Sequence, residues 1–460
     1  MIWTPTLRDF IQSHINDDTA ELLLAARRYA DVDVPFAVEQ IEARRRLKGK
    51  LPEWYANPDL IMGGRVPAEQ CSSEQTARYK RSILCGDERL GLSVESQRMK
   101  SLCDMTGGMG VDFWYMSEGM EQAIYTERNE TLCEIAKHNF KTLLSPSLNG
   151  GSSISANEET SEQGNYSLHL GRVRGRSVII RCGDGQKLPI PSVDVIYLDP
   201  ARRAGDGSRV YAMEDCEPNI VAWQDELLQH ARMVLVKLSP MVDLTDVIRK
   251  LHNVTDIYVV GVKNECKEVL VKQISSDSQS HPLWGTGGME GSRSGNEVQV
   301  HCVDFLTDRT IEYTFSLSDH THRDSPPCSP SLKGGEVVGL YLYEPDVTLM
   351  KAQAFVSLCH SFPVRQLEAG THLMTSNEFI SDFPGRIFEV KEQIPFSSKT
   401  LKRLKQQIPQ ANIATRNFPL SADELRKKTG IRDGGDLYLF GAKVHHQGSL
   451  LLLCQKPSIM

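Results

Sequence analysis

The sequence has 460 residues, of which 40% are hydrophobic and 24% charged, which is the composition of a globular protein with roughly two to four domains. Its formal net charge of −7 excludes a uniformly basic surface for nucleic acid, and no apolar run approaches the roughly 20 residues of a membrane helix. The N-terminus lacks the basic and apolar regions of a signal peptide, and the 11 cysteines include no C-x-x-C pair. We therefore expect a cytoplasmic protein with buried thiols, no membrane segment and no metal site.

Residues 1–90 are predicted to form an N-terminal helical region. Apolar residues recur at helical spacing around Leu22 and again between residues 36 and 47. The run of arginines at 44–46 is interpreted as a solvated helix face rather than a substrate contact. Ser72 and Ser73 are candidate N-caps of a further helix that bears Arg78 and Lys80, and the position of this helix just before a glycine-rich loop allows it to fold over a site there.

A strand, a glycine-rich loop and a helix are predicted across residues 98–116. An apolar strand ends at Asp104, and a helix begins at Val111. Between them, Gly107, Gly108 and Gly110 let the backbone turn tightly and approach a ligand. Similar loops hold dinucleotides and phosphates, but the G-x-G-x-x-G pattern of a nicotinamide site and the G-K-[ST] ending of a phosphate loop are both absent. The distinguishing form is D-x-x-x-G-x-G.

Strands and helices alternate after this loop. We predict strands at 121–125, 177–180, 193–198 and 233–238, and helices near 132–140 and 220–231. Three of the strands are followed by an acid, which is Glu127, Asp184 or Asp199. Because a parallel sheet brings the carboxyl ends of its strands to one edge, where ligands bind, these acids indicate the ligand edge. The polar stretch 145–176 is interpreted as a long surface insertion.

Beyond residue 256 the pattern indicates an α+β arrangement. Antiparallel strands are predicted at 257–260, 268–274, 298–305 and 310–315, with polar inserts at 275–296 and 318–335. Predicted helices near 349–358, 398–407 and 421–428 and a strand at 449–454 follow. The stretch 386–432 is basic, since its 11 Lys and Arg against 4 acids give a local net charge of +7.

Several strings spread over nearly the whole chain together resemble one protein family. They are E-Q-C-S-S-E-Q-T-A-R-Y-K (69–80), D-M-T-G-G-M-G-V-D (104–112), Y-L-D-P-A-R-R (197–203), E-D-C-E-P (214–218), L-V-K-L-S-P-M-V-D (235–243), N-E-C-K-E (264–268), R-N-F-P-L-S-A-D-E-L-R-K-K (416–428) and G-G-D-L-Y-L-F (434–440). The form D-x-x-x-G-x-G at 104–110 is similar to motif I of class I S-adenosylmethionine (SAM)-dependent methyltransferases. The full set resembles a bacterial family of predicted methyltransferases with a THUMP-like C-terminal domain.

The resemblance implies an α/β fold with a Rossmann-like class I methyltransferase core and a mostly parallel sheet. The core is expected at 91–255, after the N-terminal helical region at 1–90. Two α+β domains are expected to follow, a small ferredoxin-like one at 256–335 and a THUMP-like, RNA-binding one at 336–460.

The same resemblance implies a SAM-dependent methyltransferase that acts on RNA, either tRNA or rRNA, by direct in-line transfer. The loop is expected to hold the methionine portion of SAM, Glu127 the ribose and Asp184 the adenine. The candidate cofactor-binding residues are Asp104, Thr106, Gly107, Gly108, Gly110, Asp112, Glu127, Arg128 and Asp184. The candidate catalytic residues are Asp199, Pro200 and Arg202, and the candidate substrate contacts are Arg78, Lys80, Arg203, Lys402, Arg403 and Lys405.

The motif D-P-A-R departs from the form D-P-P-Y of amino-group methyltransferases. Ala201 and Arg202 stand where those enzymes have a proline and an aromatic residue, which disfavours methylation of an exocyclic amine. For Arg202 and Arg203 we keep two alternatives, a clamp on a phosphate or base and a salt bridge to the nearby acids at 214 and 215.

Alternative functions also stay open. The acceptor of a SAM-dependent reaction could be a protein or a small molecule, or the chain could be a non-catalytic module that binds SAM or RNA. A mechanism through a nucleophilic Cys216 is an alternative to direct transfer. The sequence predicts neither the target nucleotide nor the oligomeric state.

Overall fold

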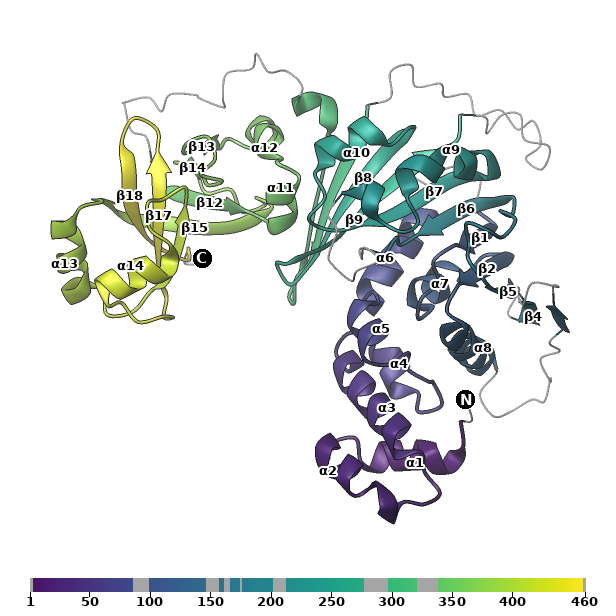
Figure 1. Ribbon diagram of the computed structural model, residues 1–460. Coiled ribbons are helices and arrows are strands. Elements are labelled where there is room, and N and C mark those ends of the chain that lie inside the picture. Colours follow the sequence, from purple (N-terminus) through teal and green to yellow (C-terminus); the bar gives the residue numbers. More distant parts are fainter. Residues whose placement is uncertain are drawn as a thin grey trace. The chain divides into compact units, whose positions relative to one another are not determined.

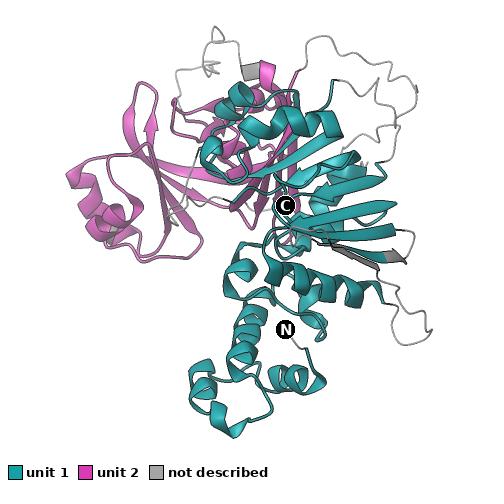
Figure 2. Cartoon of the chain, turned by 45° about the vertical axis from the view of Figure 1, so that its right-hand side comes forward, with its two compact units in different colours: residues 1–254, 271–292 teal, residues 255–270, 293–460 magenta. Residues whose placement is uncertain are grey.

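The computed structural model describes residues 3–85, 99–145, 157–160, 166–173, 176–201, 212–276, 297–320 and 338–457. The chain divides into two compact units, shown in different colours in Figure 2. Unit 1 comprises residues 1–254 and 271–292, and unit 2 comprises residues 255–270 and 293–460.

Unit 1 begins with the predicted helical region. Its helices are α1 (Pro5–Ser13), α2 (Thr19–Leu24), α3 (Val34–Leu47), α4 (Pro52–Ala56), α5 (Arg65–Gln70) and α6 (Glu74–Cys85). Trp54 and Leu47 from this region pack in one buried cluster with Met109 of the glycine loop and Val111 of the following helix. The N-terminal helices therefore share a hydrophobic core with the loop that the sequence singles out.

The arginines at 44–46 are not a simple solvated face. Arg44 is buried, and its guanidinium donates hydrogen bonds to the carbonyl oxygens of Asn57, Pro58 and Leu60. Burial lowers the pKa of Arg44 to about 10. The prediction was wrong for Arg44 because residues 57–60 form no helix or strand, so their carbonyl groups need a donor from elsewhere. Arg46 forms an ion pair with Glu69 on the surface.

The main sheet of unit 1 is Rossmann-like. Its strands are β1 (Ser101–Asp104), β2 (Gln122–Glu127), β3 (Asn157–Thr160), β4 (Tyr166–Val173), β5 (Arg176–Cys182), β6 (Val193–Leu198) and β7 (Ala231–Leu238). They lie in the order β7-β6-β1-β2-β5-β4-β3, and β9 (Cys266–Ile274), whose last residues belong to unit 1, follows β7. The pairs β1/β2, β1/β6, β2/β5 and β6/β7 are parallel, as the alternating pattern predicts.

The helices of this sheet are α7 (Val111–Met116), α8 (Glu130–Leu144), α9 (Ile220–His230) and α10 (Leu244–Lys250). The strand order runs in opposite directions on the two sides of β1, so right-handed crossovers place α7 and α8 on one face and α9 on the other, as Figure 1 shows. Such a reversal leaves a crevice at the carboxyl ends of the strands, where open α/β sheets bind ligands.

The polar stretch 145–176 contains more order than its composition predicts. β3 and β4 pair with each other in antiparallel fashion, and β4 pairs antiparallel with β5, which extends the sheet. Leu168 and Leu170 of β4 are fully buried, and these few apolar residues were too sparse to indicate a strand. Residues 146–156, 161–165 and 174–175 of the predicted insertion lie outside the described residues.

Unit 2 begins with four strands close to the predicted positions. They are β8 (Val254–Val262), β9, β10 (Gln299–Phe305) and β11 (Thr310–Ser316), in the order β11-β10-β8-β9. β10 and β11 are antiparallel as predicted, but β10 pairs with β8 in parallel. The prediction failed there because residue pattern indicates a strand without its direction, which depends on the connecting segment. That segment, the polar insert 275–296, lies mostly outside the described residues, as does the insert 318–335.

The C-terminal part of unit 2 is built on a seven-stranded sheet with the order β13-β14-β12-β15-β18-β17-β16. These strands are β12 (Tyr341–Pro345), β13 (Arg365–Gln366), β14 (Met374–Ser376), β15 (Gly385–Pro395), β16 (Asn412–Arg416), β17 (Leu437–Val444) and β18 (Gly448–Gln455). The helices are α11 (Val347–Lys351), α12 (Phe355–Ser361), α13 (Ser398–Gln407) and α14 (Ala422–Thr429). The single helix predicted at 349–358 is therefore two, because Gln353 between them has a φ of 54°.

No helix in the described parts of the chain is both long enough and apolar enough to cross a membrane.

Candidate active site

The glycine loop is pressed against β2 and α8. Gly107 N donates to the carbonyl oxygen of Thr126 at 2.8 Å, and a Cβ on Gly107 would lie 2.1 Å from the ring of Tyr125. Gly110 has a φ of 79°, and its Cβ would lie 2.6 Å from the ring of Phe140. These two positions require glycine because the aromatic rings of β2 and α8 occupy the space of any side chain.

Asp104 ends β1 beneath this loop and is 1% exposed. Its Oδ1 accepts a hydrogen bond of 2.9 Å from Thr106 N. Burial, helped by the charges of Asp112, Asp199 and Glu127, raises the pKa of Asp104 well above its ordinary value. A cation beside such a buried carboxyl group strongly stabilises its ionised form.

Glu127 ends β2 and fastens the loop to the sheet. Its Oε2 accepts from Gly108 N and its Oε1 from Asn129 N, both at 2.8 Å. Each carboxylate oxygen can accept a second hydrogen bond, so Glu127 can hold the loop and still contact a ligand. Its predicted contact with a ribose stays a prediction.

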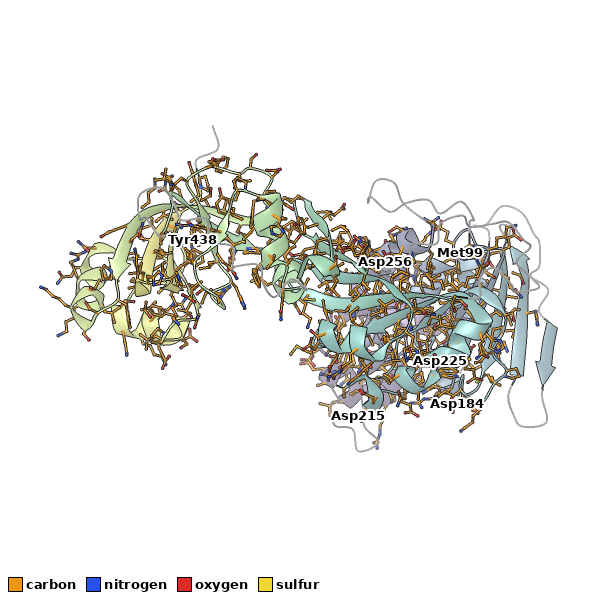
Figure 3. The ribbon with its side chains drawn as sticks, turned by 90° about the horizontal axis from the view of Figure 1, so that it is seen from above. Met99, Asp184, Asp215, Asp225, Asp256 and Tyr438 are labelled. Atoms are coloured by element: carbon orange, nitrogen blue, oxygen red, sulfur yellow. The ribbon has the colours of Figure 1, made fainter. Side chains whose placement is uncertain are left out.

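Asp184 follows β5 at the same end of the sheet. Its Oδ1 accepts from Gln186 N at 3.1 Å, and its Oδ2 lies 3.2 Å from Lys187 Nζ. The neighbouring Gly185 lies against Met105 of the loop, since a Cβ there would be 3.0 Å from the Met105 carbonyl oxygen. Figure 3 shows Asp184 on the side of the sheet opposite Met99, which precedes β1. The sheet thus brings Asp184 to the loop, as predicted for the carboxyl edge.

Asp199 and Pro200 follow β6 and are joined to the same loop. Asp199 N donates to Thr106 Oγ1 at 2.6 Å. One residue further on, Ala201 forms an isolated antiparallel bridge with Glu217, whose Oε1 lies 2.8 Å from Arg128 Nη1. Arg128 therefore supports the segment beside the D-P motif. Arg202 and Arg203 lie outside the described residues.

A buried polar cluster extends from Asp199 into the protein. Lys237 Nζ lies 2.6 Å from Asp199 Oδ2 and 4.0 Å from Asp112 Oδ2. Asp112 also accepts hydrogen bonds from Ser72 Oγ and Tyr197 Oη, both at 2.8 Å, and its Oδ1 lies 3.2 Å from Lys80 Nζ. We call these six residues, Ser72, Lys80, Asp112, Tyr197, Asp199 and Lys237, the lysine–aspartate cluster.

Opposite charges offset the cost of burying the ionised side chains of this cluster. Burial alone would raise the pKa of Asp112, but the charges of Lys80 and Lys237 and the hydroxyl groups of Ser72 and Tyr197 together lower it. Asp112 is thus held as an anion between two cations.

Sequence reasoning missed Ser72, Tyr197 and Lys237 as members of the site. The available signal was the lysine of M-V-L-V-K-L, because a lysine inside an otherwise apolar strand is rarely buried without a partner. Ser72 was seen only as a helix cap, and the contact that it makes with Asp112 joins residues far apart in sequence.

The two predicted substrate contacts on α6 lie in different settings. Lys80 is fully buried inside the cluster. Arg78 pairs with Glu53 and Glu74 and lies over the ring of Tyr115 at 4.6 Å. The structure thus joins Lys80 to the site through Asp112, whereas the contacts of Arg78 within the described part of the chain are with residues of α4, α6 and α7. A direct substrate contact by either residue stays a prediction.

Unit 2 contains the predicted basic helix. Lys402 and Arg403 are exposed on α13, where Lys405 also lies, and Arg403 Nη2 is 3.6 Å from Glu392 Oε1. The adjacent α14 adds Lys427 and Lys428 in its last turn.

Cys216 is half-buried, and its thiol lies 3.5 Å from the Ala212 carbonyl oxygen. The described residues contain no group of three or more His, Cys, Asp or Glu side chains that could hold a metal ion.

Comparison with known proteins shows two family models that match the C-terminal part of the chain. A family model described as THUMP domain-like matches residues 385–456, and one described as a ferredoxin-like domain matches residues 341–384. The ferredoxin-like match lies C-terminal to the segment 256–335, for which the sequence predicts such a fold. The predicted domain boundaries themselves stay predictions.

Among solved structures, a "putative methyltransferase" from Porphyromonas gingivalis W83 is 30% identical, with 100% of each chain covered and a TM-score of 0.76. A "putative RNA methyltransferase" from Pyrococcus horikoshii is 12% identical over 44% of this chain and 84% of that one, with a TM-score of 0.27. TrmK of M. capricolum, solved with S-adenosyl-homocysteine, is 9% identical over 44% of this chain and 68% of that one, also with a TM-score of 0.27. No curated protein matches the sequence.

Proposed function

Because this chain belongs to the same family as the Porphyromonas gingivalis protein, a Rossmann-like methyltransferase fold with a THUMP-like C-terminal domain, we propose that it is a SAM-dependent methyltransferase of RNA. The acceptor would be a nucleotide in tRNA or rRNA, methylated by direct in-line transfer in the cytoplasm. The observation that carries the proposal is the convergence of Asp104, Glu127, Asp184 and Asp199 around one glycine loop.

The residues around the loop suit SAM as a ligand. Asp104 is a buried carboxyl group with a raised pKa, and the ammonium group of the methionine portion would give it a cationic partner. Among the described residues, a Cβ on Gly108 would meet only the Thr106 carbonyl oxygen, at 3.9 Å, so this part of the loop suits the approach of a ligand. Glu127 and Asp184 provide acceptors for ribose hydroxyl groups and for adenine.

Bound SAM supplies a methyl group on a sulfonium, which a nucleophile displaces in line. The protein mainly has to hold the acceptor collinear with that group and exclude water. Asp199 is suited to this task because its main chain is tied to Thr106 of the loop and its side chain is tied to Lys237. Direct transfer predicts that Cys216→Ala keeps the methylation rate within about threefold of the native rate, since no covalent intermediate forms on the thiol.

The RNA substrate is supported by the THUMP-like match and by the basic residues of α13 and α14. Positive side chains on adjacent helices bind the phosphate backbone irrespective of the net charge of the whole chain. The C-terminal part of unit 2 is therefore proposed to bind RNA, and unit 1 to bind SAM.

The decisive experiment incubates the purified protein with methyl-labelled SAM and total RNA from a strain that lacks the protein. Label should enter RNA, and nucleoside mass analysis should then identify the methylated atom. Asp199→Asn, tested in parallel, should bind SAM and incorporate label about 100-fold more slowly. Label in protein or in small molecules alone would show a different acceptor, and a protein that fails to bind SAM would contradict the proposal altogether.

A further inference from the structure

We propose that Lys237 is a positioning residue for the reaction and that it acts by fixing the carboxylate of Asp199 at the carboxyl edge of the sheet. The inference rests on the proposed methyl transfer but concerns a residue to which the family resemblance assigns no role. It follows from three features of the lysine–aspartate cluster, which are its distances, its burial and its charge.

Asp199 is held at two points. Its main-chain N donates to Thr106 Oγ1, and its Oδ2 lies 2.6 Å from Lys237 Nζ. The Asp199 side chain is 38% exposed, whereas that of Lys237 is 13% exposed. The lysine therefore approaches the carboxylate from the interior and leaves the outer side of Asp199 for the acceptor. Among the described residues, no hydrogen bond reaches Oδ1 of Asp199.

Lys237 is itself held by the rest of the cluster. Ser72 Oγ lies 3.3 Å from Lys237 Nζ, and Asp112 Oδ2 lies 4.0 Å from it. Lys80 and Tyr197 hold Asp112 in turn, so the ammonium group of Lys237 has little freedom to move. Among the described residues, the cluster contains two lysines and two aspartates, and each lysine lies beside an aspartate.

A fixed carboxylate matters because methyl transfer depends on geometry. Without Lys237, the half-exposed side chain of Asp199 could rotate into water and lose its place beside the acceptor. Misplacement of a reacting group by about 1 Å can cost on the order of 100-fold in rate. Lys237 touches neither SAM nor acceptor in this account, and it acts only through Asp199.

The test compares Lys237→Met with a matched control, Arg232→Met. Arg232 Nη1 lies 3.5 Å from Asp194 Oδ1, and this ion pair, whose side chains are 10% and 12% exposed, joins the same two strands, β6 and β7, at the ends opposite to Lys237 and Asp199. Lys237→Met should lower kcat about 100-fold while the Kd for SAM stays within about threefold. Lys237→Arg should have a kcat at least about tenfold higher than that of Lys237→Met, since arginine restores a cation. Arg232→Met should lower Tm with kcat unchanged.

A double-mutant cycle with Asp199→Asn separates positioning from general stability. If Lys237 acts through Asp199, the double variant should have the kcat of Asp199→Asn alone, and the two effects on Tm should also fail to add. Additive losses of kcat would overturn the inference, as would a Lys237→Met variant that keeps the native kcat or loses SAM affinity in proportion to its activity.

The Tm cycle needs no acceptor, so it distinguishes this inference from the proposed function. Additive effects on Tm would show that Lys237 and Asp199 do not interact, whatever the substrate. Coupled effects on Tm together with an absence of label in RNA would instead contradict the RNA substrate, and the kcat cycle would then be run with the acceptor that takes up label.

Discussion

Tyr125 on β2 donates a hydrogen bond of 2.6 Å from its hydroxyl group to the carbonyl oxygen of Gly108. The ring of the same tyrosine fills the space beside Gly107. One side chain therefore fixes both the conformation of the glycine loop and its distance from the sheet. The fit of the loop to a ligand therefore depends on the position of Tyr125.

We predict that Gly107→Ala greatly weakens SAM binding. The added Cβ would lie 2.1 Å from the Tyr125 ring, so the loop or the buried ring has to move, which costs about 1–3 kcal/mol. Isothermal titration should show a Kd for SAM raised about tenfold or more. Gly49→Ala is the control, since a Cβ at Gly49 would meet no atom of the described residues within 4 Å. Native affinity in Gly107→Ala would show that the loop does not need its observed conformation.

Asp104 and Asp199 should have separable roles. Asp104→Asn keeps the size of the side chain but removes the charge available to an ammonium group, and SAM affinity should fall by about 10- to 100-fold. Asp199→Asn should leave the Kd for SAM within about threefold and lower methyl transfer about 100-fold or more. Calorimetry measures the first effect and label incorporation the second. The assignment fails if both variants lose SAM affinity equally or if Asp199→Asn keeps its turnover.

The sequence was sufficient to predict the parallel core and the acids at its strand ends, because strand pattern and the position after a strand are local properties. It was sufficient for the position of α13, whose bounds, Ser398–Gln407, agree with the prediction. It was insufficient for the partners of buried charges. Lys80 was predicted as a substrate contact on a capped helix, and only the fold brings it to Asp112, 32 positions along the chain. The sequence also could not predict the direction of β10, because the parallel pairing of β10 with β8 depends on the segment that connects the two strands.

The basic helix should carry RNA binding independently of SAM. The triple variant Lys402→Glu, Arg403→Glu, Lys405→Glu should bind RNA at least about tenfold more weakly near 0.1 M salt. The slope of log Kd against log salt concentration should fall by about two to three. The matched control reverses three exposed cations of unit 1, Arg27, Arg28 and Lys48, which changes the net charge equally. Filter binding over a salt series measures both proteins. Equal losses in the two triple variants would indicate a general charge effect rather than a site.

Two buried carboxyl groups of unit 2 should make its stability depend on pH. Asp304 of β10 and Asp346, the N-cap of α11, are 0% and 3% exposed. Burial, followed by the charge and hydrogen bond of Asp346, raises the pKa of Asp304 from 3.8 to about 7. A raised pKa in the folded state means that the proton stabilises the fold, so this contribution is complete below pH 3.8 and is lost as the pH rises through about 7.

Asp304→Asn should abolish this pH dependence, because an amide of the same shape has no proton to lose and can still donate to Asp346. Its Tm should match that of the native protein near pH 5 and exceed it by a few degrees near pH 8.5. Asp308→Asn, which removes the same charge from an exposed turn, is the control. Thermal unfolding at several pH values tests the pair. A constant difference in Tm between Asp304→Asn and the native protein across this range would mean that Asp304 is already ionised in the folded state.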